Sequence, residues 1–371
     1  MDDYPTIKLA AVQAAPVWLD RDATVQKACQ LIHEAGENGA DIVGFPENFI
    51  SGYPAWYYYH PATSKKSFEF AREHFKSSVE VPSEATDQLC KAARRAGVYV
   101  IMGINERRPR TTGTLYNTNL FIDKSGTIIG KHQKLVPTIT EKLVHTNGNG
   151  STLRTFPSEY GQLSSLVCGE NANPLAVSVI TAEYPVVHVA NWPPNFIPKY
   201  IPMPDATLMV CRSISYTCKC FVISSCGVNS DEMIELLPVT DEDKETLHDQ
   251  QITGGSAIIA PGGFVIAGPL VGSEESILYG DADLEDTVHG RLIHDFGGHY
   301  NRADVLNLTV NVSDPHLVSR SNGHRQQSSL PGENLEAVQE TGEVQKDVRA
   351  IDNHTGAELV LERVSGKSDT F

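Results

Sequence analysis

The chain has 371 residues and a formal net charge of −16, with 40% apolar and 20% charged residues. This composition can fill the core of a globular protein, and the excess of acidic residues argues against nucleic acid or an anionic membrane surface as the main partner. No stretch approaches the roughly 20 consecutive apolar residues that a membrane-spanning helix needs.

The cysteines and the N-terminal stretch bear on the compartment. The sequence has seven cysteines at irregular spacing, and it begins with an acidic stretch that runs into an apolar one. A secretory leader has a basic start, so none is predicted. An odd number of cysteines without an export signal indicates reduced thiols, and we expect a cytoplasmic protein.

The first half of the chain alternates between strand and helix patterns. Asp22 is a candidate N-cap for the first helix, because apolar residues follow it at intervals of three and four. Ser83 and Gly97 are candidate ends of a second helix. In order, we expect a strand at 7–13, a helix behind Asp22, a strand at 41–47, a helix at 83–97 and a strand at 98–106.

The second half contains two hairpin signals, Lys124-Ser125-Gly126 and Gly262-Gly263, each flanked by apolar runs. Between them we expect a helix after Pro174, a strand at 186–191, a helix near 205–217 and a strand at 220–225. Strands, helices and hairpins mixed in this way predict an α/β or α+β sheet protein.

The composition shifts after about Asn311. Residues 313–371 contain one aromatic residue, Phe371, and are rich in Gly, Ser, Gln and Glu. We therefore predict one folded domain at 1–312 and a C-terminal tail at 313–371 that is disordered or ordered by a partner chain.

Three ionisable residues stand at the ends of predicted strands: Glu47, Lys134 and Cys168. Strand ends at one edge of a sheet are where α/β folds gather their sites. There the carboxylate could take the thiol proton, the ammonium could stabilise developing negative charge, and the thiolate could attack an electrophilic carbon. Each residue also has an ordinary explanation, as a solvated charge or as a small core thiol.

Other patterns are weaker. Four cysteines lie close together in the sequence, but no Cys-x-x-Cys pair supports a zinc site, and buried thiols explain them as well. The glycine-rich stretches lack phosphate-loop spacing. The aromatic run at 55–60 could pack in a core, form a subunit face or line a substrate pocket. The four cysteines are Cys211, Cys218, Cys220 and Cys226. We predict no cofactor and no metal.

The segments around the three strand ends match a family. They read GFPENFISGYP around Glu47, GKHQKLVPTITEKLV around Lys134 and LVCGENANPLA around Cys168. The match continues through HVANWPP, GGSAIIAPGGFVIAGPL, GDADL and FGGHYNRADVLNLTVN. In this order, over roughly residues 6–311, the chain resembles the nitrilase branch of the carbon–nitrogen hydrolases.

The resemblance implies a four-layer α-β-β-α sandwich with a Glu-Lys-Cys site. It implies that Glu47 is the general base, Lys134 the stabilising cation and Cys168 the nucleophile, with Glu141 a second glutamate beside them. The backbone N–H of Gly169 would help to hold the anionic intermediate. Glu170 matches a further acidic residue of the family, and we expect its role to be structural rather than chemical. Tyr53, Trp192 and Pro193 are expected in the wall of the substrate pocket.

Two positions depart from the family pattern. Many nitrilases carry Trp after the nucleophile, where this chain has Gly169. The usual WGxGDG after the second glutamate is here HTNGNG, at His145–Gly150. The loop has lost an aromatic and an acidic residue, and because it follows Glu141 directly, the pocket shape is expected to differ.

The resemblance implies hydrolysis of a small organic nitrile to a carboxylic acid and ammonia through a thioimidate and a thioester. Lys134 and the helix that begins at Pro174 are expected to lower the pKa of the Cys168 thiol. An amidase or a nitrile or cyanide hydratase could use the same groups, and a non-catalytic assembly protein of this fold is a further alternative. The family also implies a homo-oligomer built from dimers that stack into spirals or filaments.

Overall fold

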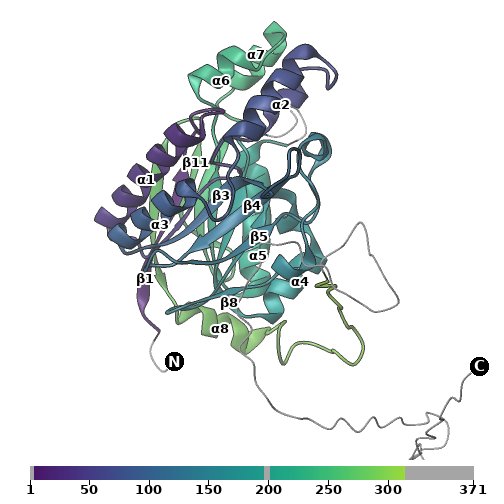
Figure 1. Cartoon of the computed structure of the whole chain (residues 1–371). Helices are drawn as coiled ribbons and strands as arrows, with labels where there is room; N and C mark the ends of the chain where they lie inside the picture. Colours follow the sequence, from purple (N-terminus) through teal and green to yellow (C-terminus); the bar gives the residue numbers. More distant parts are fainter. Residues whose placement is uncertain (1–3, 196–200, 314–371) are drawn as a thin grey trace, which may run out of the picture. The chain divides into compact units, whose positions relative to one another are not determined.

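The computed structural model describes residues 4–195 and 201–313, which form two six-stranded sheets packed face to face between helices (Figure 1). This arrangement confirms the predicted four-layer sandwich. The predicted tail at 313–371 lies outside the described residues apart from Ser313, so the boundary at 312 stays a prediction.

The two sheets share one plan, with parallel strands in the centre and antiparallel strands toward the edges. The first has the order β12-β1-β2-β3-β4-β5 and the second β11-β10-β9-β8-β7-β6. In the first, β1, β2 and β3 run parallel, and in the second, β7, β8 and β9 do. The strands of the first sheet are β1 (Thr6–Gln13), β2 (Ile42–Gly44), β3 (Tyr99–Arg107), β4 (Leu115–Ile122), β5 (Ile128–Gln133) and β12 (Ser276–Asp283). Those of the second are β6 (Phe156–Ser158), β7 (Gly161–Val167), β8 (Pro185–Trp192), β9 (Phe221–Cys226), β10 (Gly254–Ala260) and β11 (Phe264–Val271).

Both hairpin predictions are confirmed, since β4 pairs antiparallel with β5 and β10 with β11. The strand predicted at 41–47 is wrong in length, because only residues 42–44 join the sheet. Phe45 still donates to Ile101 O, but Pro46 has no N–H to continue the ladder. The chain turns out of the sheet there, and Glu47 N donates to Trp192 O of the second sheet, 3.3 Å away.

Two helices cover the outer face of each sheet. The helices α1 (Arg21–Glu37) and α3 (Glu84–Ala96) cover the first sheet, and α4 (Pro174–Ala182) and α5 (Met203–Cys218) the second. The predicted ends of α3 are confirmed: Ser83 forms a capping box and Gly97 has a left-handed φ of 68°. For α1 the predicted cap Asp22 is wrong. Asp20 is the N-cap, because its extended backbone lets Oδ1 accept from Ala23 N.

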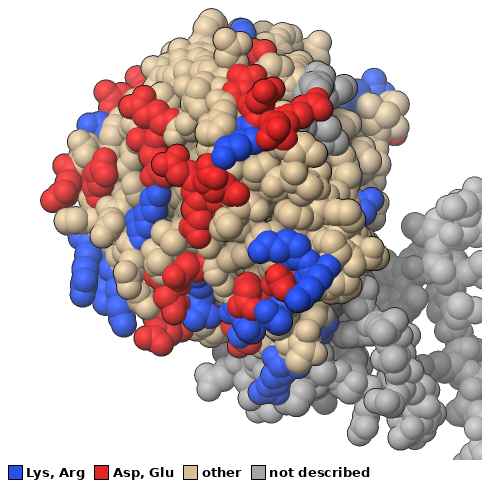
Figure 2. Space-filling view, turned by 90° about the horizontal axis from the view of Figure 1, so that it is seen from above, with Lys and Arg blue, Asp and Glu red and all other residues tan. Residues whose placement is uncertain are grey.

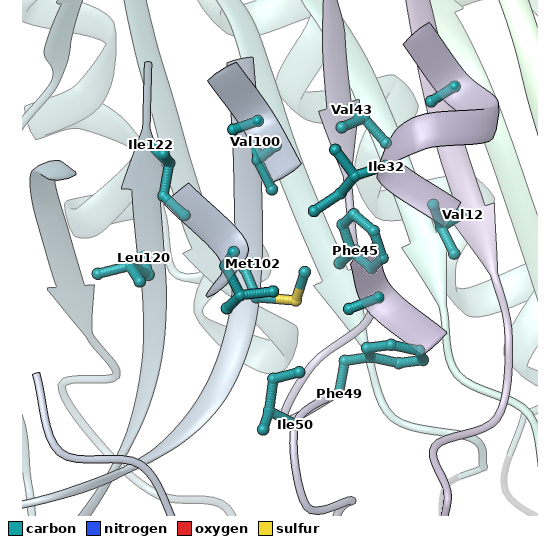
Figure 3. Close-up of a cluster of buried hydrophobic side chains, with 14 of the residues drawn as sticks. Val12, Ile32, Val43, Phe45, Phe49, Ile50, Val100, Met102, Leu120 and Ile122 are labelled. Atoms are coloured by element: carbon teal, nitrogen blue, oxygen red, sulfur yellow. The ribbon is translucent and has the colours of Figure 1, made fainter. Parts of the chain in front are cut away.

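The apolar core has three layers. One cluster lies between the first sheet and its helices, where the Phe45 and Phe49 rings are 5.4 Å apart (Figure 3). A second fills the space between the sheets, and a third lies between the second sheet and α4 and α5. Within the layer between the sheets, the buried side chains of Asn119, Asn191 and Ser165 hydrogen-bond to one another. An unpaired amide there would be costly, so these bonds fix how the sheets are placed against each other.

A cap of helices lies over one end of the sheets, at the top of Figure 1. It consists of the 3₁₀ turn η1 (Ala55–Tyr58), α2 (Lys65–Ser77), α6 (Asp231–Leu236) and α7 (Asp241–His248), and α8 (Asp286–Ile293) lies near the opposite end. Trp18, Trp56 and Phe70 form the aromatic centre of the cap. Acidic and basic side chains are interspersed over the face seen from above in Figure 2. Among the described residues no helix is long and apolar enough to span a membrane.

Gly103 on β3 provides a test of how tightly the turn before Glu47 is packed. A methyl group at Gly103 would lie 2.1 Å from Pro46 O, a backbone atom that cannot move away without shifting the turn. We expect Gly103→Ala to lower the free energy of unfolding by about 2–3 kcal/mol, measured by denaturant titration. The matched control is Gly113→Ala, where a methyl group meets nothing within 4 Å. Equal stability of the two variants would contradict this account.

Candidate active site

The structure brings together the three residues that the sequence placed at strand ends. Glu47 lies in the turn after β2, Lys134 follows β5 directly, and Cys168 follows β7 as the first residue of the 3₁₀ turn η4 (Cys168–Ala172). Each is at most 2% exposed. Burial of a carboxylate and an ammonium is costly unless each is paired, so the surroundings of these groups decide what they can do.

The ammonium of Lys134 lies between two buried carboxylates. Its Nζ is 2.9 Å from Glu47 Oε1 and 2.5 Å from Glu141 Oε2. Glu141 belongs to the 3₁₀ turn η2 (Ile139–Leu143) and is fully buried. The predicted second glutamate is thus beside the site, and one cation is shared by two anions.

Asn117 on β4 joins the same two carboxylates. Its Nδ2 donates to Glu47 Oε1 at 2.6 Å and to Glu141 Oε1 at 2.8 Å, and Thr138 N donates to Glu141 Oε2 at 3.0 Å. Asn117 was not among the site residues predicted from the sequence. The available signal was the polar run Asn117-Thr118-Asn119 inside a strand that is otherwise apolar or aromatic, because a buried amide must find polar partners.

The surroundings drive the pKa values of the two carboxyls apart. Burial raises the pKa of Glu47 to about 7, with Lys134 opposing the rise and the Glu141 charge adding to it. Burial acts on Glu141 in the same sense, but Lys134 and His145 outweigh it and lower the pKa of Glu141. Among the described residues nothing hydrogen-bonds to Glu47 Oε2, so this oxygen is available to take up a proton.

The predicted low pKa of the nucleophile is wrong. Burial raises the pKa of the Cys168 thiol well above its usual range, and the charge of Glu47 adds to the rise. Lys134 and the N–H of Gly169 act in the predicted direction, but they do not overcome burial. Cys168 therefore carries its proton at rest. Its φ of 52° is left-handed, a strained conformation for a residue with a side chain.

Glu170 and Asn171 hold the turn that carries Cys168. Glu170 accepts from Leu135 N at 2.6 Å and from Val167 N at 3.0 Å, and these are the neighbours in sequence of Lys134 and Cys168. Its carboxylate also pairs with His132 at 3.0 Å. Asn171 Nδ2 donates to Cys168 O at 2.9 Å. These contacts fix the strand ends relative to one another, in keeping with a structural role for Glu170.

The residues predicted as pocket wall lie in different surroundings. Tyr53 is buried, its hydroxyl is 3.0 Å from that of Tyr58, and burial and the charge of Glu141 raise the pKa of Tyr53 well above its usual range. Trp192 and Pro193 are buried too, and the Trp192 indole donates to Ser224 Oγ. At Gly169 a methyl group would meet nothing closer than 3.9 Å, so packing does not require glycine there.

The comparisons with known proteins agree with this geometry. The model of the carbon–nitrogen hydrolase family matches residues 8–291. A nitrilase of Bacillus sp. (strain OxB-1) is 35% identical over 315 residues, which are 85% of this chain and 91% of the relative. The chain belongs to the carbon–nitrogen hydrolase family. Its relatives make this enzyme a nitrilase-family hydrolase that acts on C–N bonds.

Further relatives carry different substrate names. An aliphatic nitrilase of Rhodococcus rhodochrous is 35% identical over 311 residues, covering 82% of this hydrolase and 83% of the relative. An arylacetonitrilase of Aspergillus oryzae is 31% identical over 332 residues, covering 87% and 97%. The solved NitFhit protein of C. elegans has the same fold, with a TM-score of 0.63 at 16% identity, covering 85% of this chain and 69% of that one.

The zinc alternative finds no support in the hydrolase. Cys211 and Cys218 are buried on α5, Cys226 ends β9, and Cys220 precedes that strand. Within residues 4–195 and 201–313, no group of three or more His, Cys, Asp or Glu side chains is arranged to hold a metal ion.

Lys134→Met tests the buried ion pairs of Lys134 with Glu47 and Glu141 through the pH dependence of stability. Without the ammonium, the folded-state pKa of Glu47 rises further and that of Glu141 rises from its lowered value, because burial is no longer opposed by Lys134. Both carboxyls titrate near 4.5 in the unfolded chain. Folding then favours the protonated carboxyls, so stability is kept at low pH and lost as the pH rises through the folded values. We expect a loss of about 3–5 kcal/mol at pH 8 and a smaller loss at pH 5, measured by denaturant titration.

The control is Lys76→Met on α2, which removes an exposed ammonium paired with Glu73. It should change stability by less than about 0.5 kcal/mol at either pH. A Lys134→Met variant with the same loss at both pH values would show that the carboxylates do not depend on this cation.

Proposed function

We propose that this enzyme is a nitrilase that hydrolyses an organic nitrile to the carboxylic acid and ammonia through a covalent bond to Cys168. The observation that supports it most is the buried ammonium of Lys134, shared by Glu47 and Glu141 beside the thiol. Nitrilases among the relatives at 31–35% identity support the same reaction class.

In the proposed reaction Glu47 accepts the proton of the Cys168 thiol as sulfur attacks the nitrile carbon. Lys134 and the N–H of Gly169 stabilise the developing negative charge on nitrogen, and Glu47 returns a proton to give the thioimidate. A first water adds to the carbon, and ammonia leaves to give the thioester. A second water, deprotonated by Glu47, releases the acid and returns the proton to sulfur. The sum is one nitrile and two waters to one acid and one ammonia.

The raised pKa values favour proton transfer during the attack. A thiolate formed in advance would be an additional buried anion beside Glu47 and Glu141, and its formation is therefore unfavourable. A base is most effective when its pKa is close to the working pH, and the pKa of Glu47, about 7, meets this condition. We therefore assign Glu47 as general base and Glu141 as the anion that anchors Lys134.

The second candidate is an amidase or a nitrile or cyanide hydratase. Amidases of Nesterenkonia sp. share the fold, with a TM-score of 0.55 at 17–18% identity, and an amide can enter the same sequence of steps. The reactions differ in their products. A nitrilase releases ammonia and acid from a nitrile, a hydratase accumulates amide without ammonia, and an amidase is inactive on nitriles.

We predict that a panel of aliphatic, aromatic and arylacetonitriles contains at least one substrate that yields acid and ammonia in equal amounts. Cys168→Ala should abolish this turnover, and Glu47→Gln should lower kcat at least about 100-fold, equivalent to about 3 kcal/mol of activation barrier. Ammonia and amide are measured together. Cys90→Ser, a half-buried thiol on α3, is the control and should keep wild-type turnover. Undiminished turnover by Cys168→Ala would exclude the nucleophile assignment.

We further propose that the enzyme is cytoplasmic and associates into dimers that stack into spirals. All seven cysteines are free, which fits a reducing compartment. Large apolar side chains are exposed on α5 and β11, among them Met209, Tyr216 and Phe264. Exposed apolar patches are typical of protein interfaces.

We expect truncation after Asn311 to reduce the particle size, because residues 313–371 are proposed to stabilise the stacking of dimers. Light scattering and size-exclusion chromatography of the full chain and the truncated chain measure this. Denaturant titration of both serves as the control for folding. An unchanged particle size would refute the role of the tail.

A further inference from the structure

His145 lies in direct contact with the Glu141 carboxylate. Its side chain is fully buried, and its Nδ1 is 3.3 Å from Glu141 Oε1. The backbone keeps the two residues together, because His145 N donates to Glu141 O at 2.7 Å. The loop HTNGNG, noted above for losing an aromatic residue, thus places an imidazole beside the buried group of Lys134, Glu47 and Glu141, called the Lys134 array below.

The other ring nitrogen fixes where one proton lies. His145 Nε2 is 2.8 Å from Asn105 Oδ1. The orientation of this amide is determined by its Nδ2, which donates to Ile50 O at 3.0 Å and to Gly52 O at 2.9 Å. Asn105 Oδ1 can only accept, so His145 Nε2 must carry a proton.

A second proton is then needed between His145 Nδ1 and Glu141 Oε1. Among the described residues His145 Nδ1 forms no well-aligned hydrogen bond, and it lies 3.3 Å from Glu141 Oε1. An unprotonated nitrogen so close to an anionic oxygen is unfavourable in a buried site. The other ligands of Glu141 identify the group that carries the proton. Glu141 already accepts from Lys134, Asn117 and Thr138, as an ionised carboxylate does. The proton therefore belongs on the imidazole.

The charge of the array leads to the same assignment. Glu47 and Glu141 carry two negative charges when both are ionised, and Lys134 supplies one positive charge, which leaves one buried negative charge uncompensated. The other titratable group that faces the ring is His74 on α2, whose ring centroid is 6.1 Å away. Burial, and then the charge of His145, lower the pKa of His74 to about 3, so it is neutral. An imidazolium at His145 brings the array to zero net charge.

We propose that His145 is a positioning residue of the proposed nitrilase reaction: as an imidazolium it donates from Nδ1 to Glu141 and keeps that carboxylate ionised and oriented as the anchor of Lys134. The inference rests on the proposed function, since it concerns the same site. His145 touches neither the nucleophile nor the reacting carbon in this account. It acts through Glu141 on Lys134, and through the net charge of the array on the ionisation of Glu47.

Two amide variants separate the two ring nitrogens. In His145→Gln the amide reaches the position of Nε2 and keeps the contact with Asn105, but nothing donates to Glu141. In His145→Asn the amide lies at the position of Nδ1 and can donate to Glu141 as a neutral group, while the contact with Asn105 is lost. Two similar polar residues thus test opposite sides of the ring.

We expect His145→Gln to lower kcat about 10- to 100-fold with little change in KM, and to shift the acid limb of the kcat profile upward by about one pH unit. The limb moves upward because loss of a positive charge makes Glu47 harder to ionise. His145→Asn should recover most of kcat, because it still donates to Glu141, while its acid limb shifts upward as in His145→Gln, because it too lacks the positive charge. Wild-type kcat and an unshifted limb in His145→Gln, or equal losses in both variants, would overturn the proposal.

A measurement that needs no nitrile tests the role of His145 independently of the proposed nitrilase reaction. Alkylation of Cys168 by iodoacetamide also requires the thiol proton to be taken up by Glu47, so its rate, followed by mass spectrometry, should show the same upward shift in His145→Gln. If no nitrile is hydrolysed, the proposed function fails, while the alkylation profiles still decide the role of His145. Unfolding midpoints of both variants serve as the control for folding, and alkylation profiles identical to the wild type would overturn the proposal.

Discussion

The candidate active site of this hydrolase depends on one ammonium held between two buried carboxylates. An isolated charge in such a place would lose its proton or take one up. Lys134 stays charged because Glu47 and Glu141 contact it from two sides, and the carboxylates remain close together because Lys134 lies between them. Each group thus depends on the others, and the segments that carry them have to be held at hydrogen-bond distance from one another.

The two sheets hold these segments in place. Glu47 follows a strand that ends early because Pro46 cannot extend it, and the turn is fixed by a backbone bond to Trp192 of the opposite sheet. Lys134 and Cys168 follow strands of different sheets, and Glu170 connects the backbone next to each of them. The Asn119, Asn191 and Ser165 side chains hold the sheets in one relative placement behind the site. Rigid strands and specific polar bonds, rather than mobile loops, therefore position the candidate catalytic groups.

Features that depend on local residue order could be predicted from the sequence. The hairpins, the ends of α3 and the strand ends before Lys134 and Cys168 follow from turn residues, caps and apolar spacing. The predicted N-cap of α1, Asp22, lies two residues from the observed one, Asp20. Both are aspartates before the same apolar pattern, so the spacing of apolar residues cannot tell which of them caps the helix.

Features that depend on the packing of the two sheets could not be predicted. Asn117 and Glu47 are 70 positions apart, and nothing local indicates that they touch. The contact of His145 with Asn105 spans 40 positions. The direction of the thiol pKa was missed because burial, a property of the whole fold, outweighs the nearby lysine. The sequence indicated the candidate groups, whereas the sheet packing determines the direction of their pKa shifts.

The protonated state of Cys168 at rest has a consequence for the lifetime of the enzyme. Thiolates, and not thiols, are the form that peroxides oxidise, and oxidation beyond the sulfenic acid is irreversible in most proteins. In the proposed reaction Cys168 loses its proton only as the electrophile arrives, so its sulfur is protected from such damage between turnovers. The burial that raises the pKa of the thiol thus also protects the sulfur from oxidation.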